Sequence, residues 1–172
     1  MMLPVWITSL PRFHNWEKYY DQLAIQTEKH KTNPVGNNFA IEDTDGIWSN
    51  LYDTFLAKAQ QILGPLTLLP SNKQTCWCYP SNKDFYKSNI HDHKNTSVIN
   101  AVYYFSVPDT KEYRDGAISF YDAADAEIWT YKPREQDLIL FPNYLRHQPL
   151  PISSEHYRFA INMEIMCNYK GN

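Results

Sequence analysis

Two histidines stand two residues apart in the segment NIHDHKNTSVINAVYYF, residues 89–105, directly before a long apolar run. In a β-strand, residues i and i+2 point to the same face, so this spacing aims His91 and His93 together and turns Asp92 away. Imidazole nitrogen is a suitable ligand for iron, zinc, copper and nickel. The pair therefore indicates two ligands of a metal site, although a His-x-His pair alone is a weakly specific signal.

A third ligand of such a site should come from a distant strand. The chain has six histidines, of which His14 and His30 fall in a region that we expect to be helical. His147 follows the apolar run DLILF, where we expect the chain to leave a strand and place a side chain at the rim of a barrel. Two histidines and one carboxylate with open positions are typical of non-haem Fe(II) oxygenases, and three imidazoles give similar geometry with one less negative charge.

Arg158 is the next residue whose type and place suggest chemistry. It lies in YRFAIN, inside an apolar strand. A buried arginine requires an anionic partner, and its planar fork matches a carboxylate. That partner is either a bound molecule or a structural carboxylate such as Asp122 or Asp137.

The elements that must position these residues begin with two helices. One is predicted from Trp16 onward with Asn15 as its N-cap, and another is predicted to end at Gly64-Pro65. Their apolar stripes are Trp16, Tyr19, Tyr20 and Leu23 in the first helix, and Trp48, Leu51, Phe55, Ala59 and Ile62 in the second.

Short β-rich runs follow after Pro65: LTLL, TCWCY, VINAVYYFSV, AISFY, EIWTY, DLILF and YRFAINMEIMC. Turns are predicted at YRDG, residues 113–116, and at AADA, residues 123–126. Regularly spaced strands without intervening helices favour a β-sandwich or barrel. We therefore expect one domain over residues 1–172, with a mainly helical support region at 1–65 packed on a mainly β jelly-roll core at 66–168.

Taken in order, these motifs resemble the prolyl-hydroxylase-like branch of the Fe(II)/2-oxoglutarate oxygenases. The similarity runs from about residue 75 to residue 166 through HDH, INAVYYFS, DGAISFYD, YKPREQDLILFPNYLRHQPLP and YRFAIN. It extends to a group of small HxH-type oxygenases from phages and bacteria. The resemblance implies a double-stranded β-helix (cupin-like) fold that uses Fe(II), 2-oxoglutarate and O₂. The expected reaction hydroxylates an unidentified substrate and decarboxylates 2-oxoglutarate to succinate, with ascorbate as a candidate reductant.

The resemblance also implies roles for individual residues. His91 takes the place of the first metal ligand and His147 that of the distal ligand. Arg158 takes the place of the residue that holds the far carboxylate of 2-oxoglutarate, and Tyr104 that of a tyrosine hydrogen-bonded to it. The resemblance further implies that Tyr79 lies near the co-substrate. Asn100 and Asn162 are expected in the same region if the predicted strand alternation holds. Core packing is the competing interpretation for both tyrosines.

Position 93 departs from the family pattern, which has a carboxylate where this chain has His93. Three outcomes stay open. His93 ligates the metal and gives a three-histidine site, which is the outcome we favour. Alternatively, Asp92 swings in through a β-bulge, or the position is left to an exogenous anion.

Composition limits the other classes of function. The net charge of −3 argues against a polyanion-binding surface, and we find no clear nucleic-acid signature. No apolar run approaches the roughly 20 residues that span a bilayer, and the N-terminus lacks the pattern of a secretory signal. We expect a cytoplasmic protein whose three cysteines form no disulfide framework. The sequence does not predict its oligomeric state.

Three rival interpretations stay open. Cys76 and Cys78 could combine with the histidine pair as a zinc site, but a one-residue gap inside a strand is a poor zinc knuckle, so we expect core cysteines. A cupin-like dioxygenase or isomerase that does not use 2-oxoglutarate shares the histidines, and so does a binding module that has lost its metal.

The sequence does not identify the substrate. The polar loops at residues 31–46 and 81–89 are expected to frame the cleft.

Overall fold

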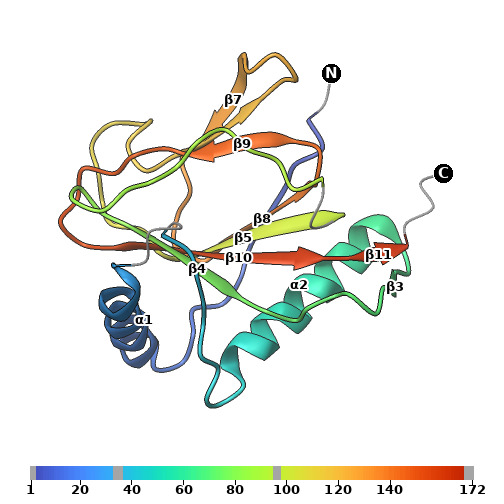
Figure 1. Ribbon diagram of the computed structural model, residues 1–172, viewed down its shortest axis with the longest axis horizontal. Helices are drawn as coiled ribbons and strands as arrows, with labels where there is room; N and C mark the ends of the chain where they lie inside the picture. Colours follow the sequence, from blue (N-terminus) through green and yellow to red (C-terminus); the bar gives the residue numbers. More distant parts are fainter. Residues whose placement is uncertain (1–2, 33–36, 95–97, 169–172) are drawn as a thin grey trace.

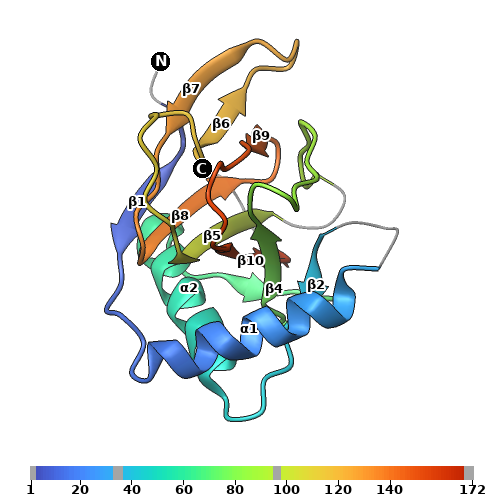
Figure 2. The same ribbon diagram turned by 90° about the vertical axis from the view of Figure 1, so that its left-hand side faces the viewer.

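The computed structural model describes residues 3–32, 37–94 and 98–168. It has three layers: a small sheet, a large sheet that faces it, and two helices that cover the outer face of the large sheet (Figures 1 and 2). The elements in chain order are β1 (Trp6–Ser9), α1 (Trp16–His30), β2 (Phe39–Ala40), α2 (Ile47–Leu63), β3 (Thr67–Leu68), β4 (Trp77–Ser81), β5 (Ile99–Ser106), β6 (Ile118–Tyr121), β7 (Glu127–Tyr131), β8 (Asp137–Pro142), β9 (Arg146–Pro149), β10 (Arg158–Ile165) and β11 (Cys167–Asn168).

The large sheet has six antiparallel strands in the order β1-β8-β5-β10-β4-β2. The small sheet has the order β7-β6-β9, and β11 pairs with β3 in a further two-stranded sheet. Two facing antiparallel sheets are what a double-stranded β-helix requires, so the mainly β jelly roll predicted from the sequence is confirmed.

The side chains of strand β10 alternate between the two faces of the large sheet. Phe159, Ile161, Met163 and Ile165 are all buried against the helices. The residues between them point to the opposite face, which looks toward the small sheet. That inner face carries Arg158, Ala160, Asn162 and Glu164, so one strand supplies both the apolar helix interface and a polar row for the site.

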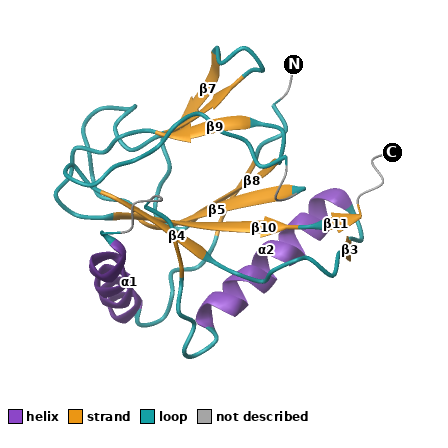
Figure 3. Cartoon of the chain, viewed as in Figure 1, coloured by secondary structure: helices purple, strands orange, loops and turns teal. Residues whose placement is uncertain are grey.

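The two helices pack as their apolar stripes predict (Figure 3). In α2, Trp48, Leu51, Phe55 and Ala59 are buried, and the N–H of Gly64 closes the helix on the carbonyl of Gln60 at 2.9 Å. The expected side-chain cap on α1 is wrong. Asn15 occupies the N-cap position with φ of 57°, but its side chain makes no capping hydrogen bond, and the N–H of Lys18 is bonded to its backbone carbonyl instead.

Three strands escaped the sequence analysis. β1 and β2 come from the region expected to be helical support, and they form the two edges of the large sheet. β9 lies in the small sheet, where it pairs with β6. Both predicted turns are present in the chain, one before β6 and one between β6 and β7. The N-terminal segment is thus part of the sheet as well as its cover.

Candidate metal centre and co-substrate cleft

Backbone pairing brings His91 and His147 side by side. The N–H of His91 donates to the carbonyl of His147 at 3.1 Å, and the N–H of His147 donates to the carbonyl of His91 at 2.9 Å. This isolated bridge adds the histidine segment to the edge of the small sheet beside β9. The imidazole centroids are 4.4 Å apart, so residues 56 positions apart in the chain form one cross-strand pair.

His93 completes a cluster of three imidazoles. One ring nitrogen from each of His91, His93 and His147 lies within 4.8 Å of the others, and among the described residues this is the group that could hold a metal ion. The ring of His93 is 5.2 Å from each of the other two, measured between centroids. The predicted three-histidine arrangement is therefore present as geometry.

The backbone fixes which nitrogen of each ring faces the cluster. Nδ1 of His91 lies 2.8 Å from the carbonyl of Asn89, and Nδ1 of His147 lies 3.1 Å from the carbonyl of Leu145. A carbonyl oxygen only accepts, so each Nδ1 carries the proton and leaves Nε2 with a lone pair for a metal. Burial also lowers the pKa of His91, and it lowers the pKa of His147 much further. Both imidazoles are thereby kept neutral, as metal ligation requires.

His93 is oriented by a carboxylate rather than by a carbonyl. Its Nδ1 lies 2.7 Å from Oε1 of Glu164, and both side chains are partly buried. The strand phase of β10 turns Glu164 toward the small sheet, across the cleft from the histidine segment. Nδ1 of His93 is thus engaged, and Nε2 is the nitrogen that this ring offers to a metal.

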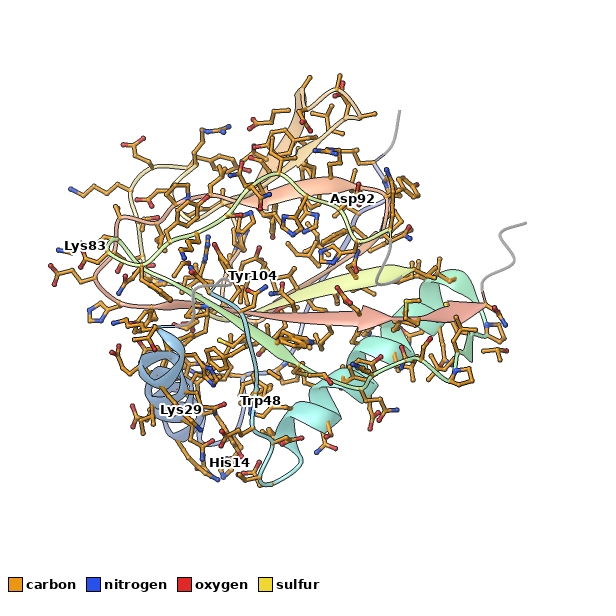
Figure 4. All side chains as sticks on the ribbon, viewed as in Figure 1. His14, Lys29, Trp48, Lys83, Asp92 and Tyr104 are labelled. Carbon is orange, nitrogen blue, oxygen red and sulfur yellow. The ribbon has the colours of Figure 1, made fainter. Side chains whose placement is uncertain are left out.

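Asp92 is not among the clustered residues. Its carboxylate bonds the backbone N–H of Lys94 at 3.3 Å and also lies 3.3 Å from the Lys94 ammonium. Figure 4 shows Asp92 in the layer of the small sheet, and His14 at the far side beyond the helices. The other two histidines lie apart as well, since His30 stacks on Phe39 and His156 is exposed.

Two details of the sequence analysis are wrong. The segment around His91 and His93 is not a regular strand, because the bridge at His91 is its one residue with strand pairing. His147 does not sit at a rim after a strand. It lies within β9 and is 4% exposed, because the rings of Phe120, Phe141 and the other two histidines pack around its imidazole.

A cleft of about 1190 Å³ opens between the two sheets and contains the three histidines. Its walls include Tyr79, Tyr86 and Tyr104, together with Asn162 and Glu164 from β10. Both loops expected to frame the cleft contribute to it. Among the described residues, the first loop contributes Asn37 and Asn38 to the lining of the cleft. The second loop contributes Tyr86, Lys87, Ser88 and Asn89.

Arg158 is 1% exposed and is not itself among the lining residues, but it lies close enough to interact electrostatically with Tyr79 and Tyr104, which are. Its Nη1 donates to the carbonyls of Gly116 at 2.7 Å and Leu150 at 3.2 Å. Its Nε and Nη2 are buried with no hydrogen-bond partner in the described chain. A buried charge with two unpaired donors is costly, so this guanidinium is set up to receive an anion.

The structural carboxylates considered as partners for Arg158 are engaged elsewhere. Asp137 accepts hydrogen bonds from the Tyr131 hydroxyl and the Arg134 N–H, both at 2.8 Å. Asp122 accepts from the backbone N–H groups of its own turn. The interpretation of Arg158 as half of such an ion pair is therefore wrong.

Tyr104 and Tyr79 lie around the guanidinium. The charge of Arg158 lowers the pKa of both phenols, but burial outweighs it, raising the pKa of Tyr79 to about 12 and that of Tyr104 further. Tyr104 lies between the two sheets (Figure 4), and the hydroxyl of Tyr79 donates to the carbonyl of Lys87. Asn162 also lines the cleft, whereas Asn100 is buried on the same sheet face and is not among the lining residues.

The two cysteines of the CWC segment face away from the histidines. Cys76 and Cys78 belong to the core under the helices, while Trp77 between them is exposed and lines the cleft. The thiol of Cys76 donates to the carbonyl of Trp48 at 3.2 Å. Burial raises the pKa of the Cys76 thiol to about 12, which opposes the thiolate that zinc would need. The zinc interpretation is not supported.

Sequence reasoning missed two residues of the site, Glu164 and Trp77. Counting in steps of two from Arg158 along β10 reaches Ala160, Asn162 and Glu164, so the strand phase that placed Arg158 would also have found Glu164. The same count along β4 separates Trp77 from the buried cysteines on either side.

A family model described as "Putative 2OG-Fe(II) oxygenase" matches residues 75–164. A search of curated proteins found no match. The matched segment covers more than half of the chain and contains the three histidines, Arg158 and Glu164. The protein belongs to this family of Fe(II)- and 2-oxoglutarate-dependent oxygenases.

Solved structures support the fold. A prolyl hydroxylase from Trichoplax adhaerens, in complex with a hypoxia-inducible-factor peptide, is 14% identical with a TM-score of 0.63, covering 95% of this chain and 83% of that chain. A prolyl 4-hydroxylase from Phytophthora capsici is 14% identical with a TM-score of 0.60, covering 96% of this chain but only 59% of that chain. HygX from Streptomyces hygroscopicus, with nickel and 2-oxoglutarate bound, is 14% identical with a TM-score of 0.60, covering 93% of this chain and 81% of that chain.

These likenesses confirm the prolyl-hydroxylase-like double-stranded β-helix. In the described part of the chain, no helix has the length and apolar character needed to cross a membrane.

Proposed function

We propose that His91, His93 and His147 hold Fe(II) through their Nε2 atoms. The convergence of their ligand atoms within 4.8 Å supports this assignment. The carbonyls bonded to Nδ1 of His91 and His147 add to it, because they fix the tautomer that a metal needs. With three protein ligands, the metal would keep coordination positions for 2-oxoglutarate and O₂.

The observation that carries the proposal is the buried guanidinium of Arg158, which has two unpartnered nitrogens among the described residues and interacts with the cleft-lining Tyr79 and Tyr104. In our proposal, Nε and Nη2 of Arg158 donate a pair of hydrogen bonds to the distal carboxylate of 2-oxoglutarate. Tyr104 donates a further bond, and Tyr79 and Asn162 line the same part of the cleft. We assign Asn100 a supporting role beneath this wall, because its side chain is buried on the inner face of the large sheet but does not line the cleft.

When bound, iron would supply the oxidising chemistry with O₂ as the oxidant: one oxygen atom would enter succinate as 2-oxoglutarate loses CO₂, and the other would hydroxylate a substrate C–H bond. The chain contributes orientation and a dry environment. Arg158 fixes one end of the co-substrate, the histidines fix the other end, and the apolar residues Val102, Ile118 and Ala160 exclude water between them. The substrate enters from the side of the two polar loops, at residues 37–38 and 86–89.

Succinate release tests the proposal. The protein, supplied with Fe(II), 2-oxoglutarate, O₂ and ascorbate as reductant, should convert 2-oxoglutarate to succinate even without its substrate, at a slow uncoupled rate. H91A and H147A should each abolish this turnover. H156A, which removes an exposed histidine outside the cleft, is the matched control and should keep it. Equal turnover in H147A and in H156A would contradict the proposal.

A second function stays in consideration because of one observation. A site of three histidines without a carboxylate ligand also fits a cupin-like dioxygenase or isomerase that does not use 2-oxoglutarate. In such an enzyme Arg158 would have no co-substrate to bind. Metal-dependent binding of 2-oxoglutarate therefore separates the two functions, and it would also exclude a binding module without a metal.

A further inference from the structure

Glu164 is the carboxylate that approaches the histidine cluster from the opposite sheet. Its Oε1 lies 2.7 Å from Nδ1 of His93. It also lines the cleft that contains the cluster. The contact connects β10 of the large sheet with the histidine segment at the edge of the small sheet.

This contact is informative because His93 is the position at which this chain differs from the prolyl-hydroxylase-like sequence pattern. His91 and His147 each direct Nδ1 to a carbonyl two residues earlier in the chain. The partner of His93 is different in kind and origin, since it is a side-chain carboxyl group and comes from another sheet. A carboxylate is thus placed one imidazole away from the three clustered ligand nitrogens.

We propose that Glu164 is the positioning residue for His93 and that it supplies, through the imidazole, the negative charge missing from the three-histidine site. Nδ1–H of His93 donates to Glu164, which holds the ring so that Nε2 points to the metal. The carboxylate makes that Nε2 a stronger donor. This inference rests on the proposed function, because it assumes that His93 binds the metal.

A purely structural ion pair is the competing explanation. His93 and Glu164 have side-chain exposures of 22% and 33%, and partly exposed pairs of this kind contribute little to folding stability. Folding stability therefore gives little reason for this contact to exist. The two explanations differ in one respect, since the positioning role requires that Glu164 act on the metal through His93.

Cobalt(II) binding to the purified full chain measures this action without turnover. Isothermal titration calorimetry gives the Kd, and the visible absorption of bound Co(II) reports its ligand field. E164A should weaken Co(II) binding by about 10- to 100-fold and shift the absorption bands. E164Q should weaken it less, because the amide oxygen still accepts from Nδ1–H while the charge is lost. E164Q also serves if E164A folds poorly, as judged by its thermal unfolding.

A double-mutant cycle with H93A decides whether Glu164 acts through His93. In the H93A background, E164A should change the Co(II) Kd by less than about twofold, because the imidazole that transmits its effect is gone. D92N removes a nearby carboxylate that is paired with Lys94, so it should weaken Co(II) binding clearly less than E164A does. This variant is the control for a general loss of negative charge.

Three results would overturn the inference. E164A and E164Q could both bind Co(II) like the wild type. E164A could weaken binding as much without His93 as with it, which would make Glu164 a direct ligand. D92N could weaken binding as much as E164A. In each case wild-type Co(II) binding would leave the proposed function standing, whereas a wild type that binds no Co(II) would remove both.

Discussion

Tyr104 is the residue at which packing and chemistry overlap most closely. Its ring fills the space between the sheets, and its hydroxyl lies near the charge of Arg158. Y104F removes the hydroxyl and keeps the ring, so the free energy of unfolding should change by less than about 1 kcal/mol. If the hydroxyl binds the co-substrate, the Kd of 2-oxoglutarate should rise about 3- to 10-fold, the value of one hydrogen bond.

Calorimetric titration of 2-oxoglutarate into the Mn(II)-loaded protein measures this effect. Y131F is a suitable control, because Tyr131 bonds Asp137 and does not line the cleft. An unchanged Kd in Y104F would make Tyr104 a core residue only.

His147 gives a second prediction at the residue scale, which concerns pH. Burial holds the pKa of the folded His147 well below the value of about 6.5 expected in the unfolded chain. Below that value the unfolded state binds a proton that the folded state does not. The metal-free protein should therefore be fully stable above about pH 6.5 and lose up to about 1.4 kcal/mol per pH unit below it.

Urea unfolding of the metal-free protein at pH 5.5 and pH 7.5 checks this dependence. H147Q, which cannot titrate, should lose less stability between the two pH values than the wild type does. An equal loss in both proteins would assign the dependence to other groups, such as His91, whose pKa is also lowered.

Residues whose burial is costly could be identified from sequence. Arg158 in an apolar strand and three histidines near strands are expensive or rare, so their types alone suggested a site. For Glu164 and Asn100, strand phase gives the sheet face but not the role. Their roles depend on which side chains face them from the other sheet, as His93 faces Glu164, and a local pattern does not contain that information.

At the scale of elements, the turn before β6 holds Arg158 in place. The carbonyl of Gly116 accepts from Nη1 of Arg158 at 2.7 Å, and Gly116 has φ of 76°. A Cβ there would lie 3.0 Å from Cδ1 of Ile152, in a conformation that L-residues rarely adopt. G116A should therefore destabilise the protein by about 1 kcal/mol or more and displace the carbonyl that orients the guanidinium.

The expected functional result of G116A is a weaker 2-oxoglutarate affinity with an unchanged Mn(II) affinity, because the histidines do not depend on this turn. G64A, at the other end of the molecule, also places an alanine in a conformation with positive φ, but its Cβ would have nothing within 4 Å. It should lose stability without losing 2-oxoglutarate affinity. A matching loss of affinity in both variants would contradict a local role for Gly116.

The strands with strong alternation or long apolar runs could be predicted, and the weak ones could not. β5, β8 and β10 carry their own signals, as does α2 with its apolar stripe. β1, β2 and β9 are short and owe their conformation to the strands beside them. The histidine segment is the extreme case, since tertiary contacts place it: the bridge of His91 with His147, and the hydrogen bond from the N–H of His93 to the carbonyl of Asn143.

At the scale of the whole molecule, the proposed site spans both sheets. The histidines belong to the small sheet and its edge, while Arg158, Asn162 and Glu164 belong to β10 of the large sheet. The order of motifs along the chain indicated the family, and the matched family model confirms it. What the sequence could not give is the cleft itself, because the distance between the sheets is set by packing on both of them.

The central claim is that the metal and Arg158 bind one co-substrate between the sheets. Arg158→Met tests it with little change to the fold. Removing a buried charge offsets the loss of two carbonyl bonds, so the free energy of unfolding should stay within about 1 kcal/mol of the wild-type value. Thermal unfolding checks this condition before binding is measured.

Titration of 2-oxoglutarate into Mn(II)-loaded protein is then the decisive measurement. The wild type should bind 2-oxoglutarate only when Mn(II) is present, and R158M should bind it at least about 100-fold more weakly at an unchanged Mn(II) affinity, because two charged hydrogen bonds are lost. R114M, which removes an exposed arginine paired with Glu127, should bind like the wild type. Equal 2-oxoglutarate affinity in R158M and the wild type would contradict the account.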